Sequence, residues 1–196
     1  MASSRRARAP SPRWLEPSLK EAIDAVGRVR WIVGPSRVHH LFLPDWVDAY
    51  RDAELCGAPG LPEKRRDLRF AHVIGDAPLE AWRGQLDEHL FAGAPGMSEV
   101  VFFHPASRTL VLTDLCFNRR PEDPDHARLF HWLVRARGFG PHRIIRLAIR
   151  DTRAAAHSVA RILEWDFDRV IVSHGAVLEH GGHAAFEKAF AHLRRT

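Results

Sequence analysis

The chain has 196 residues, of which 45% are hydrophobic and 27% are charged. This length supports one domain with a buried core, and the composition excludes a disordered or collagen-like protein. No apolar run approaches the roughly 20 residues of a transmembrane helix, so the sequence predicts a soluble protein without a membrane partner. Two cysteines, Cys56 and Cys116, are too few for a disulfide scaffold, which favours a cytoplasmic location.

The formal net charge of +5 raises the question of nucleic-acid binding. Four arginines lie in the first 13 residues, which contain no acidic residue. Elsewhere basic and acidic residues alternate, as over 63–67, and no basic stripe carries regularly spaced aromatic residues. We therefore predict a disordered Arg-rich tail over 1–13, a single domain over 14–196, and no specific nucleic-acid partner.

Apolar periodicity and turn residues predict helices that alternate with strands. In the N-terminal half we expect a helix over 17–26, a strand over 29–34, a helix from Pro44 through Tyr50, a loop over 61–69, and strands over 54–58, 70–74 and 86–91. In the C-terminal half we expect a hairpin of strands 99–104 and 108–113, helices over 124–136, 141–149 and 152–165, a strand over 169–173 and a terminal helix after Gly182. This order predicts an α/β domain.

Three groups of candidate site residues follow the ends of predicted strands. His39 and His40 follow the strand over 29–34, Asp114 follows the hairpin, and His174 follows the strand over 169–173. Loops at strand ends often carry the functional sites of α/β proteins, because the sheet fixes their positions. Imidazoles with a carboxylate are suitable ligands for zinc, iron or manganese.

The segments around these residues resemble the metallo-β-lactamase superfamily. They are Gly34-Pro35-Ser36-Arg37-Val38-His39-His40, then Thr113-Asp114, and finally Ser173-His174-Gly175, each after a strand. The resemblance covers roughly residues 29–180 and is greatest to a divergent bacterial subgroup. It implies a four-layer αβ/βα sandwich. Only about 28 residues precede the first strand, which implies that the family's opening strands are missing or replaced, and an uncovered sheet edge favours a homodimer.

The sequence differs from the family motif mainly at the ligands of one of the family's two metal sites. If Gly34 replaces the motif's threonine, its first two histidines fall on Pro35 and Arg37, and the histidine before the hairpin falls near 94–96. Those three histidines form the family's first metal site. The remaining residues belong to the second site, with His39 in the position of the aspartate. The resemblance thus implies one divalent metal ion, zinc first and iron or manganese next, bound by His39, His40, Asp114 and His174.

A single metal with an open coordination position would lower the pKa of bound water and supply hydroxide. The resemblance therefore implies a mononuclear metal-dependent hydrolase acting on a small anionic or ester-like substrate. Asp114 and Arg37 would be its catalytic residues, with Arg37 offering positive charge to an anionic substrate. Two alternatives remain open: a non-catalytic binding or structural protein with a degenerate metal site, and an iron-binding redox protein.

Other residues near these strand ends have both functional and structural interpretations. Glu99 and His104 could support the metal ligands, or they could simply be solvated at the ends of their strand. Cys116 could line a pocket, but the sequence places no base beside it. His72, His180 and His183 fit core, edge or loop positions as well as a site.

Overall fold

The computed structural model describes residues 15–75, 77–119 and 138–195, so the predicted tail over 1–13 and the predicted helix over 124–136 lie outside the described residues. The described N-terminal half contains α1 (Pro17–Val26), β1 (Trp31–Gly34), α2 (Leu43–Ala49), β2 (Glu54–Gly57), α3 (Leu61–Lys64), β3 (His72–Val73) and β4 (Asp87–Leu90). The described C-terminal half contains β5 (Val100–His104), β6 (Thr109–Val111), β7 (Phe117–Arg119), β8 (Gly138–Gly140), α5 (Arg143–Ala148), α6 (Thr152–Ile162), β9 (Arg169–Ile171) and α7 (Gly182–Phe190).

The strands form two main sheets. The first sheet, β1-β2-β3, is parallel throughout, and β1 is one of its edges. The second sheet, β4-β5-β6-β9, is antiparallel from β4 to β6, whereas β6 and β9 are parallel. The pairing of β5 with β6 confirms the predicted hairpin. A separate two-stranded ribbon joins β7 to β8.

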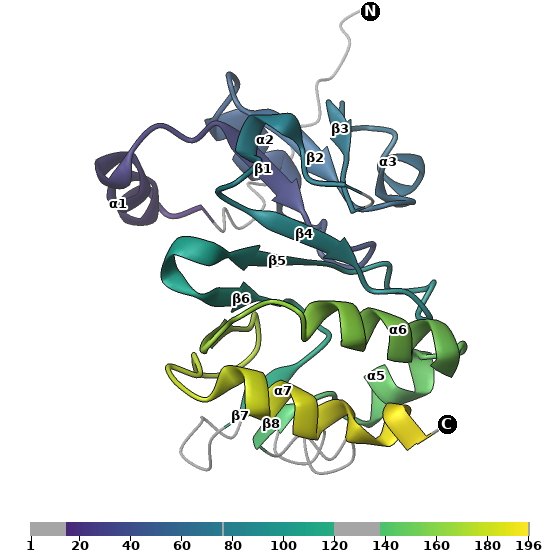
Figure 1. Cartoon of the computed structure of the whole chain (residues 1–196). Helices are drawn as coiled ribbons and strands as arrows, with labels where there is room; N and C mark the ends of the chain where they lie inside the picture. The colour runs from purple at the N-terminus through teal and green to yellow at the C-terminus, as the bar shows by residue number, and fades with distance from the viewer. Residues whose placement is uncertain (1–14, 76, 120–137, 196) are drawn as a thin grey trace, which may run out of the picture.

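Three hydrophobic clusters fill the spaces between neighbouring layers of the molecule. In β2, Leu55 packs with side chains of α2 and α3, whereas Cys56 belongs to a cluster between the two sheets. In β5, Phe102 joins that inter-sheet cluster, whereas Phe103 packs with side chains of α6 and α7. Successive residues of a strand point to opposite faces, so each sheet is covered on both sides. Figure 1 shows the resulting order of helices, sheet, sheet and helices, the order expected of an αβ/βα sandwich.

Local sequence signals account for several of these elements. The Asp151 side chain accepts a hydrogen bond from the Ala154 N–H at 2.9 Å and caps α6, as predicted. The segment over 61–69 was expected to be a loop, but it begins with the short helix α3, because Leu61 is fully buried and Pro62 stands in the first turn. β7 and β8 were not predicted, because each of them contains a single apolar side chain, Phe117 and Phe139.

The beginning of the described chain bears on the expected loss of the opening strands. The described residues before β1 form α1 and contain no strand, so β1 remains an edge of the first sheet. The homodimer expected from such an edge stays a prediction.

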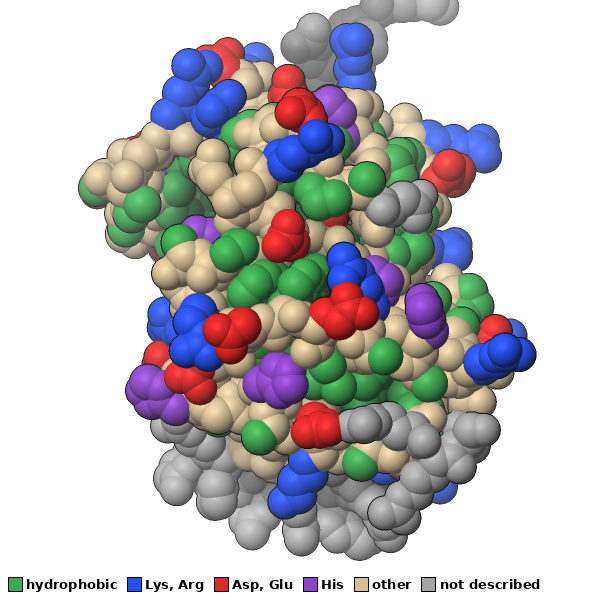
Figure 2. Space-filling model, viewed as in Figure 1, with side chains coloured by type: hydrophobic (Ala, Val, Ile, Leu, Met, Phe, Trp, Pro, Cys, Tyr) green, Lys and Arg blue, Asp and Glu red, His purple; other side chains and the backbone are tan. Residues whose placement is uncertain are grey.

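The surface agrees with the charge pattern of the sequence. On the face drawn in Figure 2, basic and acidic side chains lie intermingled. No helix within the described ranges is both long and apolar enough to cross a membrane.

Candidate metal centre

Three side chains with metal-binding atoms converge in the loops that follow β1, β6 and β9. His39, Asp114 and His174 each offer one such atom, and these atoms lie within 4.8 Å of one another. The two Asp114 carboxylate oxygens lie 3.3 Å from His39 Nε2 and 3.1 Å from His174 Nε2. Two imidazoles and one carboxylate suit zinc, iron or manganese. The structure therefore brings together three of the four predicted ligands.

The parallel pairing of β6 with β9 places Asp114 beside His174. Val111 pairs with Ile171, and each of the two site residues follows its paired residue by three positions. The Leu112 N–H extends the ladder by donating to the Ile171 carbonyl at 2.9 Å. Parallel strands bring their carboxyl ends to the same edge of a sheet, so residues 60 positions apart in sequence meet there.

A buried carboxylate holds the backbone of the Asp114 loop. Glu99 is fully buried, and its Oε1 accepts a hydrogen bond from the Thr113 N–H at 2.7 Å. Its Oε2 accepts from the N–H groups of Asp114 and Leu115, both at 2.9 Å. Burial raises the pKa of Glu99 to about 7, although the backbone donors favour the ionised form. Glu99 therefore fixes where Asp114 projects, one of the two interpretations that the sequence left open.

The loop after β1 delivers His39 to the centre. The Ser36 hydroxyl is buried and accepts hydrogen bonds from the N–H groups of Val38 and His39, which makes a tight turn. The same loop is tied to the second sheet, because the Val100 N–H donates to the Pro35 carbonyl at 2.8 Å. The first sheet thus supplies one ligand and the second sheet supplies two.

The His174 side chain is set by its neighbours on β7. The Phe117 ring stacks on the imidazole with the ring centroids 4.9 Å apart and the planes 9° apart. Gly175 has a φ of +118°, and a Cβ there would come within 2.1 Å of the Asn118 carbonyl oxygen. The backbone therefore requires glycine after His174, which explains the His-Gly pair in physical terms.

The hydrogen bonds within the cluster shift its pKa values. Partial burial alone would raise the pKa of Asp114, but the hydrogen bonds to His174 and His39 outweigh it and hold this pKa well below its usual range. The hydrogen bond to Asp114 raises the pKa of His39. A carboxylate that stays ionised next to two imidazoles is a suitable anionic ligand for a cation.

The fourth predicted ligand, His40, lies outside this cluster. Its Nδ1 is 3.2 Å from the Arg65 guanidinium, which also donates to the His40 carbonyl at 2.6 Å. Burial and the nearby Lys64 and Arg65 lower the pKa of His40. The adjacent imidazoles diverge after the Ser36 turn, so the structure does not support His40 as a ligand beside His39.

The predicted catalytic residue Arg37 is also directed elsewhere. Its guanidinium donates to the Pro95 carbonyl at 3.4 Å, and its Cδ lies 3.1 Å from where a Cβ on Gly60 would stand. The side chain therefore packs between Gly60 and the turn before β5. The expected role of Arg37, to present a positive charge to the substrate, is not supported by this placement.

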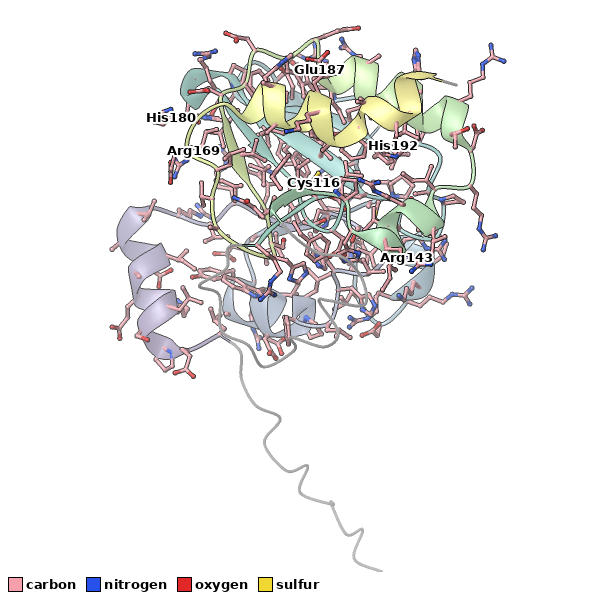
Figure 3. The ribbon with its side chains drawn as sticks, turned by 90° about the horizontal axis from the view of Figure 1, so that it is seen from below. Cys116, Arg143, Arg169, His180, Glu187 and His192 are labelled. Carbon is pink, nitrogen blue, oxygen red and sulfur yellow. The ribbon has the colours of Figure 1, made fainter. Side chains whose placement is uncertain are left out.

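The other candidates lie away from the centre. Cys116 is fully buried, burial raises its pKa well above the usual value, and Figure 3 shows its side chain inside the molecule. His104 Nδ1 lies 2.7 Å from the Ser107 hydroxyl in the hairpin turn. The other histidines that the sequence analysis considered have partners of their own: His72 contacts Glu54, His180 contacts Asp168 and His183 contacts the Leu163 carbonyl.

The fold and the cluster together define a two-sheet α/β sandwich with a His/Asp centre at its strand ends. No family model and no curated protein matches the chain. Solved structures do match. A metallo-β-lactamase from Pontibacter korlensis is 12% identical with a TM-score of 0.57, over 93% of this chain and 80% of that protein.

Two further structures extend the comparison. The metallo-β-lactamase FIM-1 from Pseudomonas aeruginosa, in its mono-zinc form, is 12% identical with a TM-score of 0.55, over 90% of this chain and 71% of that protein. The rubredoxin oxygen:oxidoreductase from Desulfovibrio gigas is 14% identical with a TM-score of 0.58, over 92% of this chain and 48% of that protein. The chain therefore has the metallo-β-lactamase fold, as its motifs predicted. The bacterial subgroup stays a prediction.

Proposed function

We propose that the protein is a metal-dependent hydrolase that binds one divalent metal ion through His39, Asp114 and His174. The observation that carries this proposal is the convergence of three ligand atoms within 4.8 Å from three separate strand-end loops. Zinc is the first candidate and iron or manganese the next, because two imidazoles and a carboxylate suit all three. Three protein ligands leave a coordination position open, which is typical of catalytic sites.

The residues of this chain have distinct parts in the proposed site. When bound, a divalent metal supplies Lewis acidity, which lowers the pKa of water and polarises a carbonyl oxygen. Asp114 provides the negative charge of the ligand set, and Glu99 fixes its loop. Phe117 holds the His174 ring in place by stacking.

The count of one metal follows from the residues around the loop after β1. If Gly34 is aligned with the threonine of the family motif, Pro35 and Arg37 fall on two of its histidines, and neither residue type is a usual metal ligand. Arg37 donates to a backbone carbonyl. An ester-like substrate is therefore the better proposal, because the side chain expected to attract an anion is committed elsewhere.

Elemental analysis of protein purified without an affinity tag or chelator tests this proposal. We expect about one zinc, iron or manganese per chain, together with ester hydrolysis that chelation abolishes and the same metal restores. Two metals per chain would contradict the single site, and a folded protein that takes up none would favour the non-catalytic alternative. Stoichiometric iron that changes oxidation state would favour the redox alternative.

A further inference from the structure

A cavity of about 580 Å³ adjoins the candidate metal centre. Its lining includes His39 and His174, so it opens onto the proposed ligands. Thr113 and Ser173, which precede Asp114 and His174, also line it. Its size is within the range of pockets that enclose small organic ligands.

The wall of this cavity beyond the centre is apolar. Trp31, Ile32 and Val33 line it in succession, so the cavity meets β1 along its open edge rather than on one face. Leu43 and Trp46 of α2 contribute further apolar surface. The cavity therefore lies along the edge that this chain leaves uncovered.

The mouth of the cavity is also apolar. Val38, Leu41 and Phe42 belong to its lining, and all three are exposed large hydrophobic residues. Among the described residues that line it, none is Lys, Arg, Asp or Glu, and the Arg37 guanidinium is bonded to the Pro95 carbonyl. Away from the histidines and the proposed metal, a charged group buried here would lose its hydration without gaining a partner of opposite charge.

We infer that this cavity binds the apolar part of an uncharged ester or amide substrate, with the carbonyl group toward His39 and His174. The reaction at that carbonyl rests on the proposed function, whereas the binding of the apolar part rests on the cavity alone. The substrate would therefore carry an aliphatic or aromatic group that fills the cavity. The anionic substrate expected from the sequence does not match the apolar lining.

Ligand titration of the full-length protein tests the inference with and without bound metal. The probes are acetamide, butanamide, hexanamide and octanamide. Their binding is measured by calorimetry and by the change in tryptophan fluorescence, since Trp31 and Trp46 line the cavity. We expect the dissociation constant to fall by about fourfold for each methylene that enters the cavity. Suberamic acid, which has a carboxylate in place of the terminal methyl of octanamide, is expected to bind at least about tenfold more weakly than octanamide.

A pair of matched variants locates the binding. Leu41→Asp places a charge on the cavity lining at a side chain that is 71% exposed, and Leu147→Asp places one on α5 at a side chain that is 72% exposed. Both changes lie on the surface, so the fold should tolerate them equally. We expect Leu41→Asp to weaken octanamide binding about tenfold and Leu147→Asp to leave it unchanged.

Three outcomes would overturn the inference. They are affinity that does not depend on chain length, suberamic acid that binds as well as octanamide, and octanamide binding that both variants weaken equally. The inference would also fail if the protein is a dimer in solution that Leu41→Asp dissociates but octanamide does not. That result would show that a second copy of the chain covers the cavity. Because titration without metal is included, a failure of metal binding would count against the proposed function and leave this result interpretable.

Discussion

Neighbouring side chains of the loop after β1 have different roles. His39 reaches the centre and contacts the Asp114 carboxylate. Its neighbours Arg37 and His40 contact the Pro95 carbonyl and Arg65. Residue type alone therefore did not decide which side chain joins the cluster. The Ser36 turn decided it, because it fixes the direction in which each successive side chain points.

The residues of the cluster and the loop residues outside it therefore differ in what their contacts support. Within the cluster, the ligands have supporting contacts: Glu99 for Asp114 and Phe117 for His174. Outside the cluster, Pro35 and Arg37 make backbone and side-chain hydrogen bonds. These hydrogen bonds link the loop after β1 to β5 and to the turn before it.

The largest expected effect is the loss of the central carboxylate. Asp114→Ala removes the group that contacts both imidazoles, so bound metal should fall from about one to below about 0.1 per chain. His174→Ala should act in the same direction. Elemental analysis after dialysis checks this, with His104→Ala as the control that keeps its metal. Full metal content in both site variants would contradict the assignment.

A smaller effect is expected from the residue that holds the Asp114 loop. Glu99→Gln keeps the size of the side chain but replaces one acceptor oxygen by a donor facing backbone N–H groups, so metal affinity should fall about 10–100-fold. Competition titration with a metal chelator measures this loss.

Glu88→Gln is the matched control for that prediction. Glu88 is also buried, and its carboxylate accepts hydrogen bonds from the Gly75 N–H and the Trp82 Nε1–H. The control variant should lower the free energy of unfolding by about 1–3 kcal/mol without changing metal affinity. Equal losses of affinity in both variants would mean that Glu99 acts only through general stability.

The pH dependence of metal binding should follow His39. Its pKa is raised by Asp114, so as the pH falls below that raised value a proton occupies the imidazole and competes with the metal. Affinity should therefore decrease with falling pH, by up to about tenfold per pH unit for one competing proton. Asp114 stays ionised over this range, since its pKa is lowered. Titrations between about pH 8 and 5.5, with circular dichroism to monitor folding, check this. An affinity that is constant over this range would contradict it.

The smallest effects are expected for the loop residues that lie outside the cluster. His40→Ala and Arg37→Ala should each leave metal affinity within about twofold, because neither side chain joins the cluster. A tenfold loss in His40→Ala would restore the four-ligand set that the sequence predicted, and His40 would then have the same role as His39.

Much of this fold could be predicted from local patterns. The runs in β5 and β6 are apolar on both faces, which indicates buried strands, and Asp151 marks the start of α6. Asp114 and His174 could be found because each follows such a strand directly. Short elements such as α3 and β7 could not, since their position depends on contacts that are distant in sequence.

The remaining features of the site depend on three-dimensional packing. Glu99 looks like a strand-end acid in the sequence, and only the folded loop shows its three backbone partners. The cavity is lined by β1, by α2 and by the loops that carry Thr113 and Ser173, so no single segment of the sequence predicts it. The divergence of His39 from His40 depends on one turn.

The origin of the ligands in both sheets has a consequence for how the protein is made. His39 leaves the ribosome before His174, because synthesis proceeds from the N-terminus. A nascent chain that lacks β9 carries two of the three donors and cannot complete the site. Ion capture would therefore follow the emergence of β9, and it would stabilise only chains in which both sheets have docked.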